Sequence, residues 1–261
     1  MSKNLKMDKT ALLRDFLLNN FSKFSYDYSI GNPLEFPEYD LTAREYLQFA
    51  EYELLEINNH SNKLKHNHLI NCVSHLKRAV DCQLDTCLYI LKLLDLCKEK
   101  NLGLNSKLDF FKQAGVFNSF SLDRFNKVRN KMEHEYNVPD IEDIEAYFDL
   151  VTAFVSVLES MIMSLKIASE LSLTHEELDK ETITTFDIYY NFMDTPEISY
   201  RISKNEKIYD ASMSEHTYEE AFVTVTPKEI KEFPYFLKVL LLLARQDSFA
   251  NNKYIIQNIY C

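Results

Sequence analysis

Apolar residues recur at spacings of three and four along the first two thirds of the chain. This periodicity predicts helices over residues 10–24, 41–58, 64–100, 121–137 and 140–172. The clearest stripes are on the two longest of these helices, at Leu69, Val73, Leu76, Val80, Leu84, Cys87, Leu91 and Leu94, and at Ile144, Phe148, Val151, Val155, Leu158, Ile162 and Leu165. Such stripes pack against each other in a near-antiparallel bundle.

The pattern changes near residue 182, where short segments become rich in Ile, Val, Tyr, Phe and Thr. These segments predict strands over residues 182–190, 197–203, 207–211 and 221–226. The run Thr226-Pro227-Lys228-Glu229 then predicts the start of a helix that ends near Asp247, and residues 253–260 are expected to form a last strand. A small α+β domain or a sheet appended to the bundle would both fit.

Three parts are therefore expected along the chain. Residues 1–60 form an N-terminal helical extension, residues 61–175 a helical bundle, and residues 176–261 a small α+β domain of unknown role. Only three glycines and six prolines occur in 261 residues, which disfavours a turn-rich all-β fold.

Charge and cysteine content bear on the expected cellular location and on binding to nucleic acid. Five cysteines without a secretory signal predict a reducing, cytoplasmic location, and the longest strongly apolar run, residues 239–244, is too short to cross a membrane. The net charge of −11 argues against broad nonspecific binding to nucleic acid. Residues 92–131 differ, since nine Lys or Arg and four Asp or Glu leave them at +5, either a phosphate-attracting surface or merely solvated helix faces.

The segment Val128–Tyr136 contains the strongest candidate chemistry. Arg129, Asn130 and His134 form an Arg-Asn-x3-His pattern near the end of a predicted helix, and Tyr136 follows the histidine by two. Arginine holds phosphate with two parallel hydrogen bonds, and histidine transfers protons near neutral pH. The alternative is an exposed helix end on which these residues coincide.

In this form the segment resembles the HEPN family, in which an Arg-x4–6-His motif marks endoribonucleases. The order of long helix, connector, motif helix, sharp turn at Pro139 and long helix is similar to that of HEPN bundles. The run from Asn67 to Asp85 also resembles the first long helix of the family, through His75-Leu76, Arg78-Ala79-Val80-Asp81 and Leu84-Asp85. The expected fold is mainly α, with a HEPN-like antiparallel helical bundle over about residues 61–172 and an appended small α+β C-terminal domain.

The resemblance implies an endoribonuclease that needs no metal or cofactor and uses the 2′-OH of RNA as its nucleophile. It assigns a proton transfer to His134, charge stabilisation to Arg129 and an orienting role to Asn130. It also implies a homodimer that brings two motifs together, and a role as a toxin or antiviral defence effector with an antitoxin or defence-system partner. The alternative is a noncatalytic HEPN-type module that binds a nucleotide, RNA or a protein.

Further residues are candidates for supporting roles. In a toxin branch of the family, the tyrosine of Arg-x4-His-x-Tyr is adenylylated by a partner enzyme, which makes Tyr136 a regulatory candidate; the alternative is a half-buried aromatic that closes the helix. Asp81 and Asp85 are candidates to reach the site from the long helix; the alternative is that they are solvated helix acids or salt-bridge partners. Candidate contacts to RNA phosphate are Arg124, Lys127 and Lys131. The pair His66-x-His68 is only weakly suggestive of a metal site.

Overall fold

The computed structural model describes residues 8–30, 34–57, 62–118, 120–138, 141–177, 182–206, 216–246 and 248–260. The chain forms two compact units. One unit comprises residues 35–162, and the other comprises residues 1–34 and 163–261. The expectation of a mainly helical chain with a sheet in its C-terminal half is confirmed, and the strands of that sheet are antiparallel.

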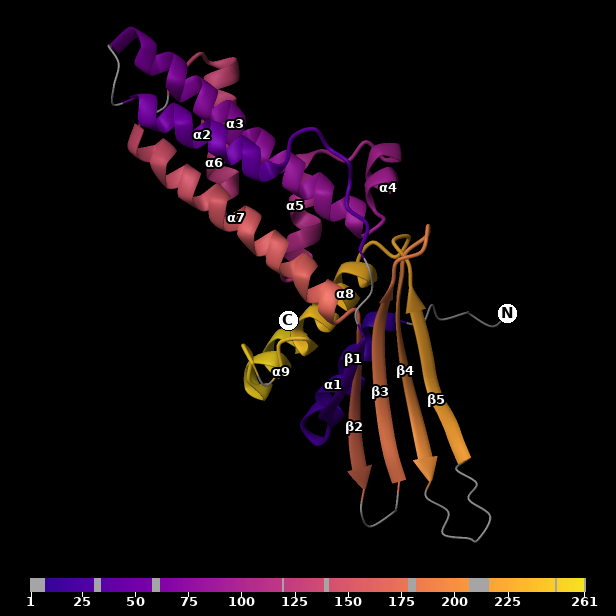
Figure 1. Cartoon of the computed structure of the whole chain (residues 1–261). Helices are drawn as coiled ribbons and strands as arrows, with labels where there is room; N and C mark the ends of the chain where they lie inside the picture. The colour runs from indigo at the N-terminus through magenta and orange to yellow at the C-terminus, as the bar shows by residue number, and fades with distance from the viewer. Residues whose placement is uncertain are drawn as a thin grey trace. The chain divides into compact units, whose positions relative to one another are not determined.

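The unit of residues 35–162 is helical (Figure 1). Its helices are α2 (Ala43–Ile57), α3 (Asn62–Ile90), α4 (Leu94–Glu99), α5 (Leu104–Gln113), α6 (Phe120–His134) and most of α7 (Ile141–Ile167). The predicted stripes on α3 and α7 form much of its core, since Leu76, Leu84, Val151 and Leu158 are fully buried. Arg44 on α2 donates to Glu159 on α7 at 2.5 Å, which joins two helices distant in sequence.

The predicted helix over residues 64–100 is wrong at its end, because the chain turns between α3 and α4. Lys92 has a φ of 55°, a left-handed conformation that does not continue a helix. Leu91, Leu93 and Leu94 on either side of it are buried. The apolar pattern therefore continued through the turn and concealed it.

The second unit contains a five-stranded antiparallel sheet in the order β1-β2-β3-β4-β5 (Figure 1). The strands are β1 (Ser25–Ile30), β2 (Glu170–Glu177), β3 (Thr182–Asn191), β4 (Glu197–Glu206) and β5 (His216–Val225). Helices α1 (Lys9–Asn20), α8 (Glu232–Leu243) and α9 (Asn252–Tyr260) complete the unit. Aromatic contacts join helices to the sheet: Phe16 stacks on Phe186 at 5.3 Å, and Tyr200 lies 5.9 Å from Phe236.

The outcomes for the predicted strands differ. Those over residues 182–190, 197–203 and 221–226 are confirmed by β3, β4 and β5, whereas residues 207–211 lie outside the described residues. The expected strand over residues 253–260 is wrong, because Ile255 and Ile259 are buried four positions apart in α9.

Two strands were not predicted. The helix predicted over residues 10–24 ends at Asn20, and after a short 3-10 turn the chain enters β1, in a segment for which the sequence predicts neither helix nor strand. The helix predicted to end at residue 172 stops at Ile167, and β2 begins at Glu170. Leu171 and Leu173 are buried in that strand, so its apolar residues extended the apparent helical pattern.

The two units group the chain differently from the expected parts 1–60, 61–175 and 176–261. Residues 35–57 belong with the helical unit, and α1 and β1 belong with the sheet. Lys9 on α1 explains part of this grouping, since its Nζ lies 2.6 Å from Glu229 Oε1 and 2.9 Å from the carbonyl oxygen of Thr224. Contacts between the two ends of the chain cannot be seen in local periodicity.

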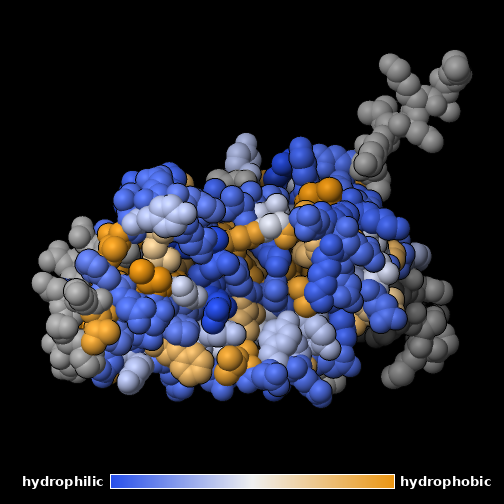
Figure 2. All heavy atoms as spheres, turned by 90° about the horizontal axis from the view of Figure 1, so that it is seen from above, coloured by the Kyte–Doolittle hydropathy of each residue, from blue (hydrophilic) through white to orange (hydrophobic). Residues whose placement is uncertain are grey.

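One helix in the described part of the chain is long and apolar enough to cross a membrane by length and composition alone. It comprises the 25 residues Asp143–Ile167 of α7. Core helices of soluble proteins meet the same two criteria, and several α7 side chains, among them Phe154 and Val155, are fully buried. The face of the molecule in Figure 2 is mainly hydrophilic, with its hydrophobic side chains in small separate groups.

Candidate functional site

Helix α6 carries all three residues of the Arg-Asn-x3-His pattern. Leu122 and Phe125 are buried on its inner side, and the Phe125 ring lies 5.3 Å from that of Tyr147 on α7. The acidic Asp123 lies in the first turn of α6 and the basic His134 in its last turn, where the helix dipole favours these residue types. This packing leaves the polar face of α6 for chemistry.

The Arg129 side chain is mostly buried and is held by an acid one turn along the helix. Its Nε donates to Glu133 Oε1 at 3.0 Å and its Nη2 to Oε2 at 2.6 Å, so both prongs of the guanidinium are used. This hydrogen-bonded pair raises the pKa of Arg129 and lowers the pKa of Glu133. The Glu133 carboxylate thus accepts hydrogen bonds from both prongs of the guanidinium.

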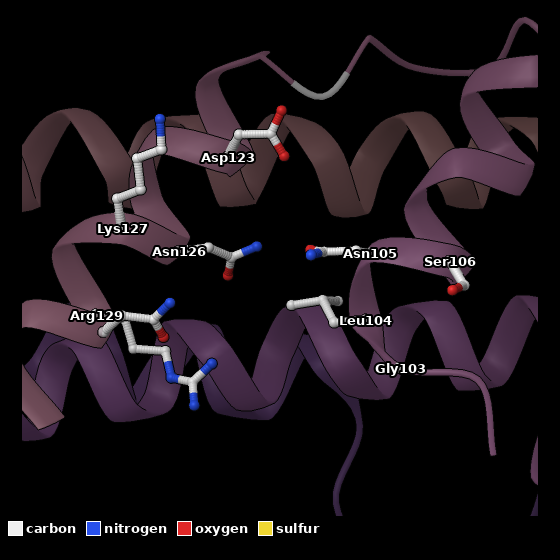
Figure 3. A pocket seen from close by; sticks show the side chains of 9 residues that line it. Gly103, Leu104, Asn105, Ser106, Asp123, Asn126, Lys127 and Arg129 are labelled. Atoms are coloured by element: carbon white, nitrogen blue, oxygen red, sulfur yellow. The ribbon is translucent and has the colours of Figure 1, made fainter. Parts of the chain in front are cut away.

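A cavity of about 590 Å³ lies between the start of α5 and α6 (Figure 3). Seven of the nine residues that line it are polar or charged; the nine are Gly103, Leu104, Asn105, Ser106, Asp123, Asn126, Lys127, Arg129 and Asn130. The side chains of Asn105 and Asn126 point toward each other across it (Figure 3). Its volume falls within the range that small-molecule sites usually have.

His134 does not line this cavity and is exposed at the end of α6. The structure therefore brings Arg129 and Asn130 to one cavity and leaves His134 outside it. Asn126, Asn130 and His134 are nevertheless spaced by four along the helix, which places them on one side of it. A ligand that follows this side of α6 would pass from the cavity to the histidine.

The two acids predicted to reach the site from α3 differ in their surroundings. Asp81 lies close enough to Arg129 for their charges to interact, and its pKa is raised, mainly because burial penalises the carboxylate. Asp85 instead accepts from Lys107 on α5 at 2.5 Å. The salt-bridge alternative therefore describes both acids, since Asp81 Oδ2 also lies 3.8 Å from Lys77 Nζ, and Asp81 contributes in addition to the electrostatics around Arg129.

The three candidate phosphate contacts on α6 are all exposed, but only Lys127 lines the cavity. Arg124 and Lys131 do not. Sequence reasoning missed the contribution of α5, whose residues 103–106 form the opposite wall. The sequence feature that indicates this wall is Gly103, which directly precedes a short amphipathic segment. It is the N-cap of α5 and makes no side-chain capping hydrogen bond.

Tyr136 is presented to solvent just beyond the motif helix. Its ring is 88% exposed, so the alternative of a half-buried aromatic is wrong. Its φ is 57°, in the left-handed region that favours glycine. A tyrosine in this conformation adds nothing to packing, and the position is accessible to a modifying enzyme.

Tyr136→Gly is expected to raise the free energy of unfolding by about 1 kcal/mol, because glycine adopts positive φ without the steric cost of a side chain. Urea unfolding of the two proteins measures this difference. Tyr52→Gly is the matched control, since Tyr52 is also exposed but lies inside helix α2, where glycine destabilises. Destabilisation by both substitutions would contradict the expected strain at Tyr136.

The weak metal hypothesis for His66 and His68 has no support. His68 Nδ1 lies 2.5 Å from Glu53 Oε2, and the same carboxylate accepts from Asn71 at 3.2 Å. Among the residues that the structure describes, no group of three or more His, Cys, Asp or Glu side chains could hold a metal ion.

Comparisons with models of protein families, with curated proteins and with solved structures found no match to this chain.

Proposed function

We propose that the chain is a metal-independent endoribonuclease of the HEPN type, which cleaves RNA by attack of the 2′-OH on the neighbouring phosphate. The observation that carries the proposal is the Arg129–Asn130–His134 set on α6, with Arg129 and Asn130 in the lining of a cavity whose other residues are mostly polar or charged. The order of α3, connector, α6 and α7 agrees with the resemblance. DNA lacks the nucleophile, so the reaction selects RNA.

The chemistry requires one proton to leave the 2′-oxygen and another to reach the departing 5′-oxygen. The 2′-oxygen forms a bond to phosphorus, the bond to the 5′-oxygen breaks, and a 2′,3′-cyclic phosphate and a 5′-OH result. His134 serves one proton transfer. Arg129 stabilises the extra negative charge on the phosphate, and Asn130 orients the histidine or a phosphate oxygen.

One histidine does not readily act as base and acid in a single step. We therefore propose a homodimer in which the second chain supplies its own His134 to a shared site, as the resemblance implies. The exposure of His134 at the end of α6 supports this arrangement, because a partner can reach it. A cytoplasmic toxin or defence effector, controlled by an antitoxin or defence partner through Tyr136, is the corresponding biological proposal.

Cleavage of single-stranded RNA in the presence of EDTA tests the proposed reaction. We expect activity to persist and the products to carry 2′,3′-cyclic phosphate or 3′-phosphate ends, identified by mass spectrometry. A DNA oligonucleotide of the same sequence is the matched control and should remain intact. Cleavage that requires added magnesium, or that leaves 5′-phosphate ends, would contradict the mechanism.

The second candidate is a noncatalytic module that binds nucleotide, RNA or protein. The specific observation in its favour is that both prongs of Arg129 are held by Glu133 while His134 stands outside the cavity. In an enzyme, RNA phosphate must replace the Glu133 carboxylate. In a binding module the same exchange would end in binding alone.

Glu133→Gln is accordingly expected to tighten RNA binding about two- to fivefold, since exposed ion pairs of this kind are worth ~0.2–1 kcal/mol. Fluorescence anisotropy with a labelled single-stranded RNA measures the change. Glu145→Gln is the matched control, because Glu145 is an exposed acid on α7 that neutralises the same charge elsewhere. Equal gains in the two variants would attribute the effect to net charge and not to Arg129.

A further inference from the structure

We infer that the cavity between α5 and α6 is the subsite for one unpaired nucleotide of single-stranded RNA, whose base edge hydrogen-bonds to Asn105 and Asn126. The inference deepens the proposed function and rests on it for the path of the RNA toward His134. It assigns a binding role to α5, which the Arg-Asn-x3-His pattern does not include.

The composition of the walls points to a base edge. An amide side chain offers donors and an acceptor together, which is the pattern on the edges of nucleobases. Asn105 and Asn126 approach each other from separate helices and point into the same space (Figure 3). Leu104 is the one large apolar side chain of the lining, and no aromatic ring lines the cavity, so recognition by edge hydrogen bonds is favoured over stacking.

Charge at the cavity suits the phosphate of the same nucleotide. Lys127 and Arg129 both line it, from the helix that also supplies Asn126. Arg129 is the deeper of the two cations, with 20% of its side chain exposed. Asp123 at the rim carries the opposite charge, which disfavours phosphate there and places the phosphate toward Arg129.

The geometry of α6 then gives the direction of the strand. Asn126, Asn130 and His134 follow one another at intervals of four residues, so at 1.5 Å per residue His134 lies about 12 Å along the helix from Asn126 and about 6 Å from Asn130. A base in the cavity therefore leaves its phosphate near Arg129 and Asn130 and the next part of the strand near His134. Duplex RNA does not fit this arrangement, because its base edges are paired.

The test measures binding separately from cleavage. Fluorescence anisotropy with a labelled RNA dodecamer of mixed sequence is carried out on the full chain with His134→Ala, which prevents turnover. Adding Asn105→Ala and Asn126→Ala is expected to weaken binding about tenfold, the usual scale for the loss of a good base contact. Asn67→Ala is the matched control, since Asn67 is exposed on α3 and should leave affinity unchanged.

Two additional arms separate the possible failures. Circular dichroism establishes that each variant is folded, and Asn105→Leu with Asn126→Leu keeps the approximate side-chain size while removing the amide donors and acceptors without adding charge, so it should weaken binding as well. Unchanged affinity in both double variants, with cleavage by the wild type still dependent on His134, would overturn the subsite and leave the proposed enzyme intact.

The opposite failure is also distinguishable. If the wild-type protein does not cleave RNA, titration with the four nucleoside 5′-monophosphates followed by NMR still tests the cavity. Binding that is lost in the Asn105/Asn126 variants would then support the subsite in a noncatalytic module. Absence of binding to the dodecamer and to all four nucleotides would overturn the inference.

Discussion

His134→Ala should slow RNA cleavage by about 10²–10⁴-fold, which is the usual contribution of a positioned acid or base. The loss should appear in kcat more than in KM, because the role proposed for the histidine is proton transfer and not RNA binding. The exposed position of His134 means that alanine leaves the core intact, so the melting temperature should stay close to that of the wild type.

His66→Ala is the matched control for this measurement. His66 is also an exposed histidine on a helix of the same unit, but it lies on α3 and outside the cavity lining. The His66→Ala protein should cleave RNA at the wild-type rate. A His134→Ala protein that also cleaves at the wild-type rate would contradict the proposed role of His134 and favour the noncatalytic module.

Arg129→Lys extends the same prediction to the second member of the pattern. An ammonium group cannot reproduce the planar two-pronged grip on phosphate, so activity should remain poor despite the retained charge. Arg78→Lys is the control for Arg129→Lys. Arg78 is exposed, and its charge acts on His75 of the same helix and not on the motif residues of α6, so its replacement should leave cleavage unchanged. Full activity of the Arg129→Lys protein would show that positive charge alone suffices.

Phe125→Ala should lower the free energy of unfolding of the helical unit by about 3–5 kcal/mol, the usual cost of removing a buried aromatic side chain. Phe125 is 1% exposed and contacts the Tyr147 ring, so its loss leaves a hole between α6 and α7. Because α6 carries Arg129, Asn130 and His134, cleavage should fall at temperatures where this helix is no longer held. Urea unfolding followed by circular dichroism measures the stability change.

Phe120→Ala is the control on the same helix. Phe120 is 68% exposed, and its ring lies 5.5 Å from Lys112 Nζ, a cation–π contact worth about 0.5–1 kcal/mol at an exposed site. We therefore expect a loss below about 1 kcal/mol. Similar losses at both positions would contradict the assignment of Phe125 to the packing of the motif helix.

Local patterns predicted those parts of the fold that depend on local interactions. The stripes of α3 and α7 appear in the core, and β3, β4 and β5 lie where their composition placed them. Predictions failed where tertiary contacts alter a continuous pattern. The turn at Lys92 and the change from α7 to β2 both occur within apolar runs, whereas α9 has residues typical of strands but buries them at helical spacing.

The sequence by itself determined which residues carry reactive groups and that Arg129, Asn130 and His134 lie on one helix, because spacing along a helix is a local property. Only the tertiary structure decided what these groups meet. In the tertiary structure, residues 103–106 lie opposite Asn126 and Asn130 across a cavity. Asp85 accepts a hydrogen bond from Lys107, and His134 lies outside the cavity lining. These outcomes depend on how helices distant in sequence pack together, and periodicity within one helix contains no information about its neighbour.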